Sequence, residues 1–288
     1  MGVDVVMKRV LRWILRGLAA VAVVLVFVGL GAFAASEAMI RWPQEKAKVE
    51  LVASRDAGAV MRGKQLAVVY GCHDCHGARL EGRLFFDEMP LGRLSGPNLS
   101  KALVHQSDAD VARAIRTGVA ADGRSLWIMP SEAFARLNDG ETADLIAYLR
   151  TFPAREGQKD VKEFGPVGRI GVLIGQFRSA PQLLKTGARV APVDLGPQYA
   201  QGRTLARACM ECHGLDLKGS QGVKSPDLAI AGAYELEDFE KLLRTGRAAG
   251  NRKLGLMTEI APARFNALSH EEIGALHAYL KARAEKAS

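Results

Sequence analysis

The feature that most constrains this chain is a five-residue pattern, Cys-x-x-Cys-His, which occurs at Cys72–His76 and again at Cys209–His213. The two copies contain all four cysteines of the 288 residues. Two cysteines three positions apart place both sulfurs on one side of a short helical turn, and the next residue adds an imidazole. Disulfides, redox-active dithiols and half zinc sites also use Cys-x-x-Cys, but none of them requires the histidine.

Each copy therefore predicts the attachment of one haem c. The two sulfurs can form thioethers with the haem vinyl groups, and the histidine can bind the iron as its proximal ligand. We expect two covalently bound haem c groups. The predicted thioether residues are Cys72, Cys75, Cys209 and Cys212, and the predicted proximal ligands are His76 and His213.

The two motifs belong to a longer internal repeat. Gly-x-x-Leu-Ala, at Gly63 and Gly202, precedes each motif, and Pro-x-Leu, Arg-Thr-Gly, Met and Ala-Tyr-Leu follow in the same order. The cysteine pairs lie 137 residues apart but the Arg-Thr-Gly sequences only 128, so the first copy has about nine extra residues, within 78–96. We expect an anchor at 1–41, a first domain at 55–155, a linker or strap at 156–196 and a second domain at 197–285.

The secondary-structure patterns are helical wherever they are clear. Asp108–Thr117 and Glu237–Thr245 are matching predicted helices, each followed by glycine, and both copies end in an amphipathic helix. Few alternating strand patterns compete, so the predicted class is all-α: a transmembrane helix followed by two tandem helical domains. In the strap, apolar residues between Ile170 and Phe177 are too dense for a solvated tether, and we expect them to pack on a domain.

An uncharged stretch of twenty residues occupies 17–36. This length suits a helix that crosses a hydrocarbon core of roughly 30 Å. Four basic residues between Lys8 and Arg16 precede it, so the positive-inside rule places the N-terminus in the cytoplasm. A cleaved signal peptide is the alternative, but its apolar core would have only about 7–15 residues. We expect a single-pass anchor in the cytoplasmic (inner) membrane, with the soluble domains on the periplasmic side.

Charge and composition argue against two other classes of protein. With 48% hydrophobic residues the chain can bury packed cores, which excludes wholesale disorder. The formal net charge is +8, and residues 1–41 contribute +3 of it. Four haem propionates would offset most of the remainder, and no basic stripe with interleaved aromatic residues is present. We therefore expect no nucleic-acid partner.

In these motifs the chain resembles the class I c-type cytochrome family, and within it the membrane-anchored di-haem cytochromes that serve periplasmic dehydrogenases. The resemblance covers roughly 55–155 and 197–285. It implies a few helices around each haem, with a small residue of the first helix packed on an aromatic residue of the last. Gly63 with Tyr148, and Gly202 with Tyr279, match those contacts.

The resemblance also implies a methionine as the distal iron ligand. Met129, in Trp-Ile-Met-Pro, and Met257, at the equivalent place in the repeat, are the candidates, although either could simply fill core space. Rival ligands for the first haem are Met89, which lies in the extra residues, and His105. We expect the other histidines on the surface or, for His277, at the edge of a core. Arg116 and Arg244 are candidates for contacts to haem propionates, or else for favourable charges at helix C-termini.

Two functions follow from these sites. If both irons have two protein ligands, the chain is an electron carrier or an electron-transfer subunit rather than an enzyme. It would relay single electrons between a periplasmic dehydrogenase or quinol-oxidising complex and a terminal acceptor such as an oxidase. The alternative is a di-haem enzyme, of the peroxidase or thiosulfate dehydrogenase type, with one open or exchangeable distal site, more plausibly at Met257 because no proline follows it.

Overall fold

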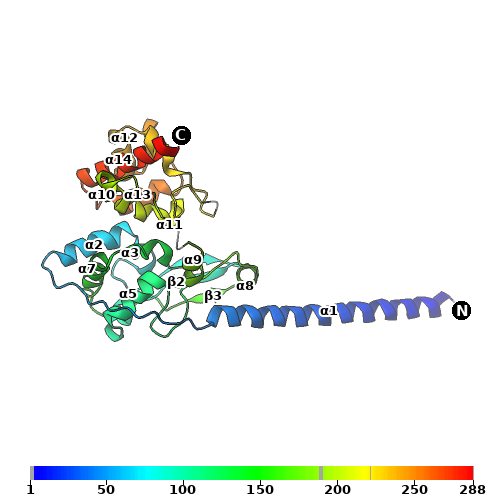
Figure 1. Ribbon diagram of the computed structural model, residues 1–288. Coiled ribbons are helices and arrows are strands. Elements are labelled where there is room, and N and C mark those ends of the chain that lie inside the picture. The colour runs from blue at the N-terminus through cyan, green and yellow to red at the C-terminus, as the bar shows by residue number, and fades with distance from the viewer. Residues whose placement is uncertain (1–2, 188–190, 221, 288) are drawn as a thin grey trace.

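The computed structural model describes residues 3–187, 191–220 and 222–287. A single long helix, α1 (Val3–Arg41), extends from the body of the molecule, and two small helical domains form that body (Figure 1). Most of α1 is exposed along its length. The expected class is confirmed as mainly helical, with small sheets in addition.

The first domain contains the residues around the first cysteine motif. Side-chain caps define several of its helices: Ser107 and Asn138 each form a reciprocal capping box with an acidic residue three positions later. Gly118, in a left-handed conformation, ends the predicted helix Asp108–Thr117, which is the middle helix of the domain. The helices are α2 (Ala59–Val69), α3 (Cys72–His76), α4 (Leu99–Ala102), the 3₁₀ turn η1 (Leu103–His105), α5 (Asp108–Thr117), α6 (Ser131–Phe134) and α7 (Asp139–Leu149).

The second domain repeats this order, with a shorter segment between its cysteine motif and the next long helix. Gly246 ends its middle helix in the same left-handed conformation as Gly118. Its α-helices are α10 (Ala200–Ala206), α11 (Met210–His213), α12 (Leu236–Thr245), α13 (Met257–Phe265) and α14 (His270–Ala287). Its remaining elements are the 3₁₀ turns η2 (Pro197–Tyr199), η3 (Arg207–Cys209), η4 (Leu228–Ala233) and η5 (Ala249–Asn251), and the strands β4 (Arg247–Ala248) and β5 (Arg252–Lys253).

The first and last helices of each domain cross at a glycine. A Cβ added to Gly63 would lie 2.0 Å from the Asp144 carbonyl oxygen and 2.8 Å from Tyr148 Cβ. At Gly202 the corresponding contacts are 2.1 Å to the Ala275 carbonyl oxygen and 2.6 Å to Tyr279 Cβ. Both predicted glycine–tyrosine contacts are therefore confirmed, and only glycine allows the two helices to approach so closely.

The extra residues of the first copy form a β-hairpin that the all-α prediction did not contain. Strands β1 (Arg83–Glu88) and β2 (Gly92–Gly96) pair antiparallel, and β3 (Lys162–Phe164), from the strap, pairs with β2. The pairing with β3 satisfies backbone groups of β2 that would otherwise lie at a sheet edge. The insertion and the strap thus fold together as one small sheet.

The strap continues into α8 (Pro166–Leu173) and α9 (Ala180–Gly187), which pack on the first domain. Trp127, Phe164 and Val172 form a small buried cluster, with Phe177 packed against it. Part of the predicted packing is wrong, however. Ile170 and Ile174 are 53% and 66% exposed, because α8 buries only one of its faces.

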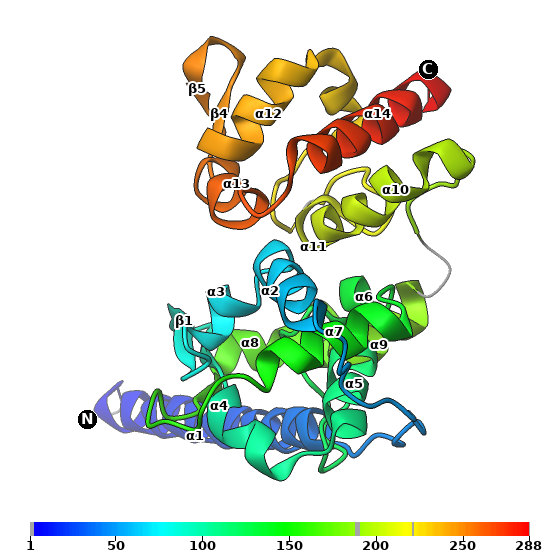
Figure 2. The ribbon, with the colours of Figure 1, turned by 90° about the vertical axis from the view of Figure 1, so that its left-hand side faces the viewer.

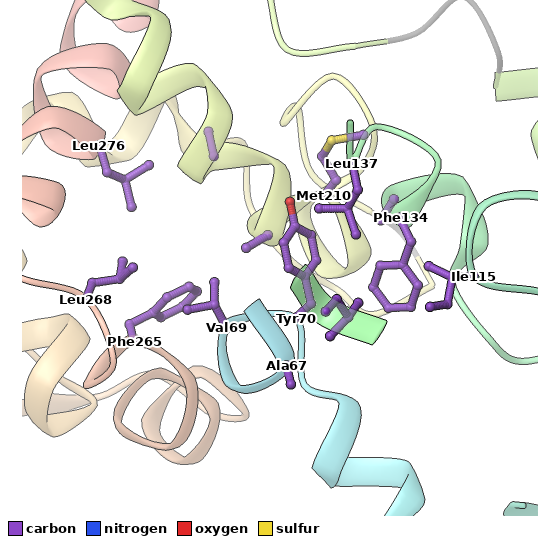
Figure 3. Close-up of a cluster of buried hydrophobic side chains, with 14 of the residues drawn as sticks. Ala67, Val69, Tyr70, Ile115, Phe134, Leu137, Met210, Phe265, Leu268 and Leu276 are labelled. Carbon is purple, nitrogen blue, oxygen red and sulfur yellow. The ribbon is translucent and has the colours of Figure 1, made fainter. Parts of the chain in front are cut away.

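The two domains share a continuous apolar interface, stacked one above the other in Figure 2. Val69 and Tyr70, at the end of α2, belong to the same buried cluster as Met210 and Phe265 of the second domain (Figure 3). Gln65 adds a polar contact, since its amide donates to the Glu272 carboxylate over 2.8 Å. Each domain therefore presents its cysteine-motif side to the other.

Candidate haem sites

The first motif is a single helical turn between two glycines. Gly71 and Gly77 have φ values of 67° and 83°, so the chain enters and leaves α3 through conformations that favour glycine. The ring of His76 donates from Nδ1 to the Pro97 carbonyl oxygen over 3.0 Å. That bond fixes the imidazole plane and leaves Nε2 to act as a metal ligand.

The second motif repeats this arrangement. His213 Nδ1 donates to the Pro226 carbonyl oxygen over 2.9 Å, and Gly214 has a φ of 81°. Sequence reasoning matched Pro97 with Pro226 in the repeat but assigned them no role. Only their recurrence in both copies could have indicated this role, because a backbone carbonyl that orients a ligand requires no particular side chain.

The donor groups fit a covalently held haem. Desolvation lowers the pKa of both His76 and His213, which favours the neutral imidazole that binds iron. None of the four cysteines, all of which lie within the described residues, forms a disulfide. Burial raises the pKa of the Cys72 and Cys209 thiols to about 12, whereas a redox-active dithiol has at least one thiol with a lowered pKa. These raised pKa values therefore argue against a site for thiol–disulfide exchange.

The two candidate distal methionines occupy similar places in their domains. Met129 lies just before Pro130 and α6, while Met257 is the first residue of α13. Both are half-buried and pack against the buried apolar cluster, as Cys72 and Cys209 also do. Iron ligation by either methionine stays a prediction.

The rival ligands lie elsewhere. Met89 is 61% exposed in the β1–β2 turn, and His105 is exposed at the end of η1. His277 is buried, and its Nε2 lies 2.8 Å from the Tyr234 carbonyl oxygen, as expected for a core-edge histidine. The expected surface position of His73 is wrong. It is half-buried and its Nε2 lies 3.1 Å from the Tyr148 hydroxyl.

Arg116 and Arg244 both have protein partners that link the middle helix to the start of the last one. Arg116 forms an ion pair with Asp139, at the beginning of α7. Arg244 donates to the Leu268 carbonyl oxygen over 2.9 Å, just before α14. Contact of either arginine with a haem propionate stays a prediction.

Sequence reasoning missed the residue that joins the two sites. Arg264, in α13, is 6% exposed. Its Nε donates to Asp74 Oδ2 over 2.8 Å, and its Nη1 donates to Glu211 Oε2 over 2.6 Å. Asp74 and Glu211 are equivalent residues, the third position of each five-residue motif. One guanidinium group thus bridges the two predicted haem-attachment turns.

This bridge places a permanent positive charge between the motifs. Burial alone would lower the pKa of Arg264, but the Glu211 and Asp74 carboxylates raise it, so the guanidinium remains charged. The same charge acts to lower the pKa of all four cysteine thiols, which shows that both pairs lie within its electrostatic reach. A Cβ added to Gly71 would lie 2.3 Å from the Arg264 guanidinium, so a larger residue there would force this ion-paired side chain to move.

Within the residues that the structure describes, one segment, Val6–Arg41 of α1, is long and apolar enough to cross a membrane. By length and composition it is a candidate either for a membrane anchor or for a signal sequence.

Comparison with known proteins agrees with this geometry. The cytochrome subunit of fructose dehydrogenase from Gluconobacter japonicus is 24% identical over 272 residues, covering 82% of this chain and 54% of the relative. The cytochrome c subunit of gluconate 2-dehydrogenase from Pantoea cypripedii is 23% identical over 270 residues, covering 79% of this chain and 60% of the relative. This chain therefore spans a little over half the length of either relative. A model of the cytochrome c family matches residues 60–153 and 199–284, so the chain belongs to the cytochrome c family and contains two cytochrome c domains.

Proposed function

We propose that the chain is a membrane-anchored di-haem cytochrome c that transfers single electrons between a dehydrogenase and a further acceptor on the periplasmic side of the membrane. The observation that carries the proposal is the Arg264 bridge, which joins two oriented Cys-x-x-Cys-His turns in one interface. Two redox groups that serve a relay need fixed relative positions, and this contact supplies them.

In this proposal each group of the chain has a defined task. Cys72 and Cys75 hold one haem, and Cys209 and Cys212 hold the other. When bound, each haem supplies an iron that accepts and releases one electron at a time. The carbonyl oxygens of Pro97 and Pro226 orient the proximal imidazoles. Met129 and Met257 would complete the coordination of the irons, which would favour the ferrous state and leave no site for a substrate.

The names of the relatives support a dehydrogenase as the electron donor, because both relatives are cytochrome subunits of dehydrogenases. The four basic residues before the uncharged stretch support a cytoplasmic N-terminus, and hence periplasmic haem domains. The exposed surface of α1 supports a helix surrounded by lipid rather than by the rest of the chain.

An optical experiment tests the proposed coordination. The purified ferric protein should show the far-red absorption band of methionine-to-iron ligation, and the ferrous protein should not bind carbon monoxide. Rapid binding of carbon monoxide at one haem would refute two saturated sites and favour the alternative of a di-haem enzyme. The same spectra also report whether haem is present at all, because covalently bound haem absorbs visible light whether or not it binds carbon monoxide.

A further inference from the structure

The strap exposes an apolar surface beside α1. We define the strap surface as the exposed side chains of Leu91, Ile128, Val167, Ile170 and Ile174, between 36% and 66% exposed. They line a single hollow of about 540 Å³ together with aromatic side chains that include Phe86 and Phe177. Isolated exposed apolar side chains are common in soluble domains, but a contiguous set marks an interaction surface.

Three of these five side chains lie on one face of a well-fixed helix, while Leu91 and Ile128 come from the hairpin turn and the first domain. Val167 and Ile170 of α8 and Ile174, the residue that caps its C-terminus, follow each other at intervals of three and four residues, so they share one side of the helix. Another side of α8 packs closely on the hairpin, since a Cβ at Gly168 would lie 2.2 Å from the Leu91 carbonyl oxygen. The close backbone contact at Gly168 therefore fixes the rotation of α8, so that these apolar side chains face outward.

Arg169 attaches this helix to α1. Its Nη2 lies 2.7 Å from Glu37 Oε2, its Nη1 donates to Ser36 Oγ over 3.1 Å, and its guanidinium carbon lies 4.1 Å from the centre of the Phe33 ring. Ser36 is completely buried by this packing. The contacts thus join α8 to the last turns of α1 before Arg41.

These contacts also set the depth of the strap surface. Phe33 and Ser36 belong to the last turn of the uncharged stretch at 17–36, where a membrane-spanning helix would leave the hydrocarbon core. Figure 1 shows α8 at the edge of the first domain from which α1 extends. An apolar helix face at this level lies in the zone between hydrocarbon and headgroups, where amphipathic helices bind.

We propose that the strap surface docks into the outer interface of the lipid bilayer and so fixes the orientation of the first cytochrome domain on the membrane. The inference rests on the proposed role of α1 as a membrane anchor. We favour lipid as the occupant because α8 is attached to α1 at Phe33 and Ser36, where the anchor would leave the hydrocarbon core. A protein or quinone on the same surface is a different outcome of the test.

Photo-crosslinking in the full-length holoprotein tests the docking. The photoreactive residue p-benzoylphenylalanine replaces Ile174 in one variant, Leu25 of α1 in a second and Ile230 of η4 in a third, and each variant is irradiated in phospholipid nanodiscs. All three positions are exposed, at 66%, 65% and 55%, so the replacement disturbs no core. Mass spectrometry of the peptides then identifies the partner. We expect phospholipid adducts at Ile174 and Leu25 and none at Ile230.

The three positions separate the possible failures. Phospholipid at Leu25 but not at Ile174 would overturn the docking and leave the anchor intact. No phospholipid at Leu25 would overturn the anchor, and the docking with it. Adducts of Ile174 with a quinone or with another polypeptide would replace lipid as the occupant, and equal lipid labelling at Ile230 would show that the labelling is unspecific.

Discussion

Replacing Arg264 by glutamine should loosen the contact between the two haem-attachment turns. The variant keeps most of the side-chain volume but loses the charge that faces both Asp74 and Glu211. Breaking a fully buried ion pair costs about 3–5 kcal/mol, whereas an exposed pair contributes about 0–1 kcal/mol. The Arg264 side chain is 8% exposed, but the carboxylates are 37% and 30% exposed. We therefore expect a total loss of about 2–3 kcal/mol, between those limits.

Amide hydrogen exchange of the holoprotein measures this loss locally. A loss of about 2–3 kcal/mol corresponds to exchange that is roughly 30- to 150-fold faster at amides that open with the contact. We expect the acceleration in peptides that contain α3 as well as in those that contain α11, because the bridge holds one turn of each domain. The buried positive charge should also favour the ferrous state of both haems, so its removal should lower both reduction potentials.

Arg283→Gln is the matched control. Arg283 is also 6% exposed and pairs with Asp227 over 2.8 Å, but both residues belong to the second domain. Its loss should accelerate exchange in the second domain and leave α3 unchanged. Arg264→Lys should restore only part of the protection, because a lysine ammonium cannot present two nitrogens in the fork of a guanidinium. Unchanged exchange of α3 in Arg264→Gln would refute the bridge as a link between the domains.

Three further predictions address the helix crossing, a buried carboxyl and the distal ligands. Gly63→Ala should lower the free energy of unfolding by about 1–3 kcal/mol. Gly274→Ala, where an added Cβ meets open space, should instead stabilise α14 by about 0.5–1 kcal/mol. Equal melting temperatures of the two variants would contradict the tight helix crossing at Gly63. Burial raises the pKa of Glu132, and its Oε2 has no hydrogen-bond partner among the described residues, so the stability that this carboxyl contributes when protonated is lost as pH rises through its folded pKa. At pH 7 the free energy of unfolding of Glu132→Gln should therefore exceed that of wild type by about 1 kcal/mol. Below the ordinary pKa of 4.5 the two proteins should be equally stable, and a stability difference that grows toward low pH in thermal melts would refute this prediction. Met129→Ala and Met257→Ala should each remove part of the far-red band and open one haem to carbon monoxide, and an unchanged spectrum would exclude that methionine as a ligand.

Local and repeated features could be predicted from the sequence. The helix ends at Gly118 and Gly246 agree with the pattern because left-handed glycine caps depend on neighbouring residues alone. The Gly63–Tyr148 contact could be predicted because the repeat supplied a second copy and the family resemblance supplied its meaning. Both cysteine motifs lie in short turns with oriented histidines, as the spacing requires.

Features that depend on distant partners could not be predicted. The strands of the hairpin have no clean alternation, and β2 gains its second neighbour only from β3, which lies far along the chain. Arg264 contacts residues that are 190 and 53 positions away, and an arginine in an amphipathic helix is ordinarily a surface residue. The exposure of Ile170 and Ile174 likewise depends on which side of α8 meets α1 and the hairpin.

We propose that each Cys-x-x-Cys-His turn holds one covalent haem, and intact-mass spectrometry of the denatured protein tests this assignment most directly. We expect a wild-type mass that exceeds that of the polypeptide by two haem groups. The Cys72→Ala/Cys75→Ala and Cys209→Ala/Cys212→Ala variants should each retain one haem. A wild-type chain with fewer than two haems, or a double variant that still carries two, would contradict the assignment of one haem to each turn.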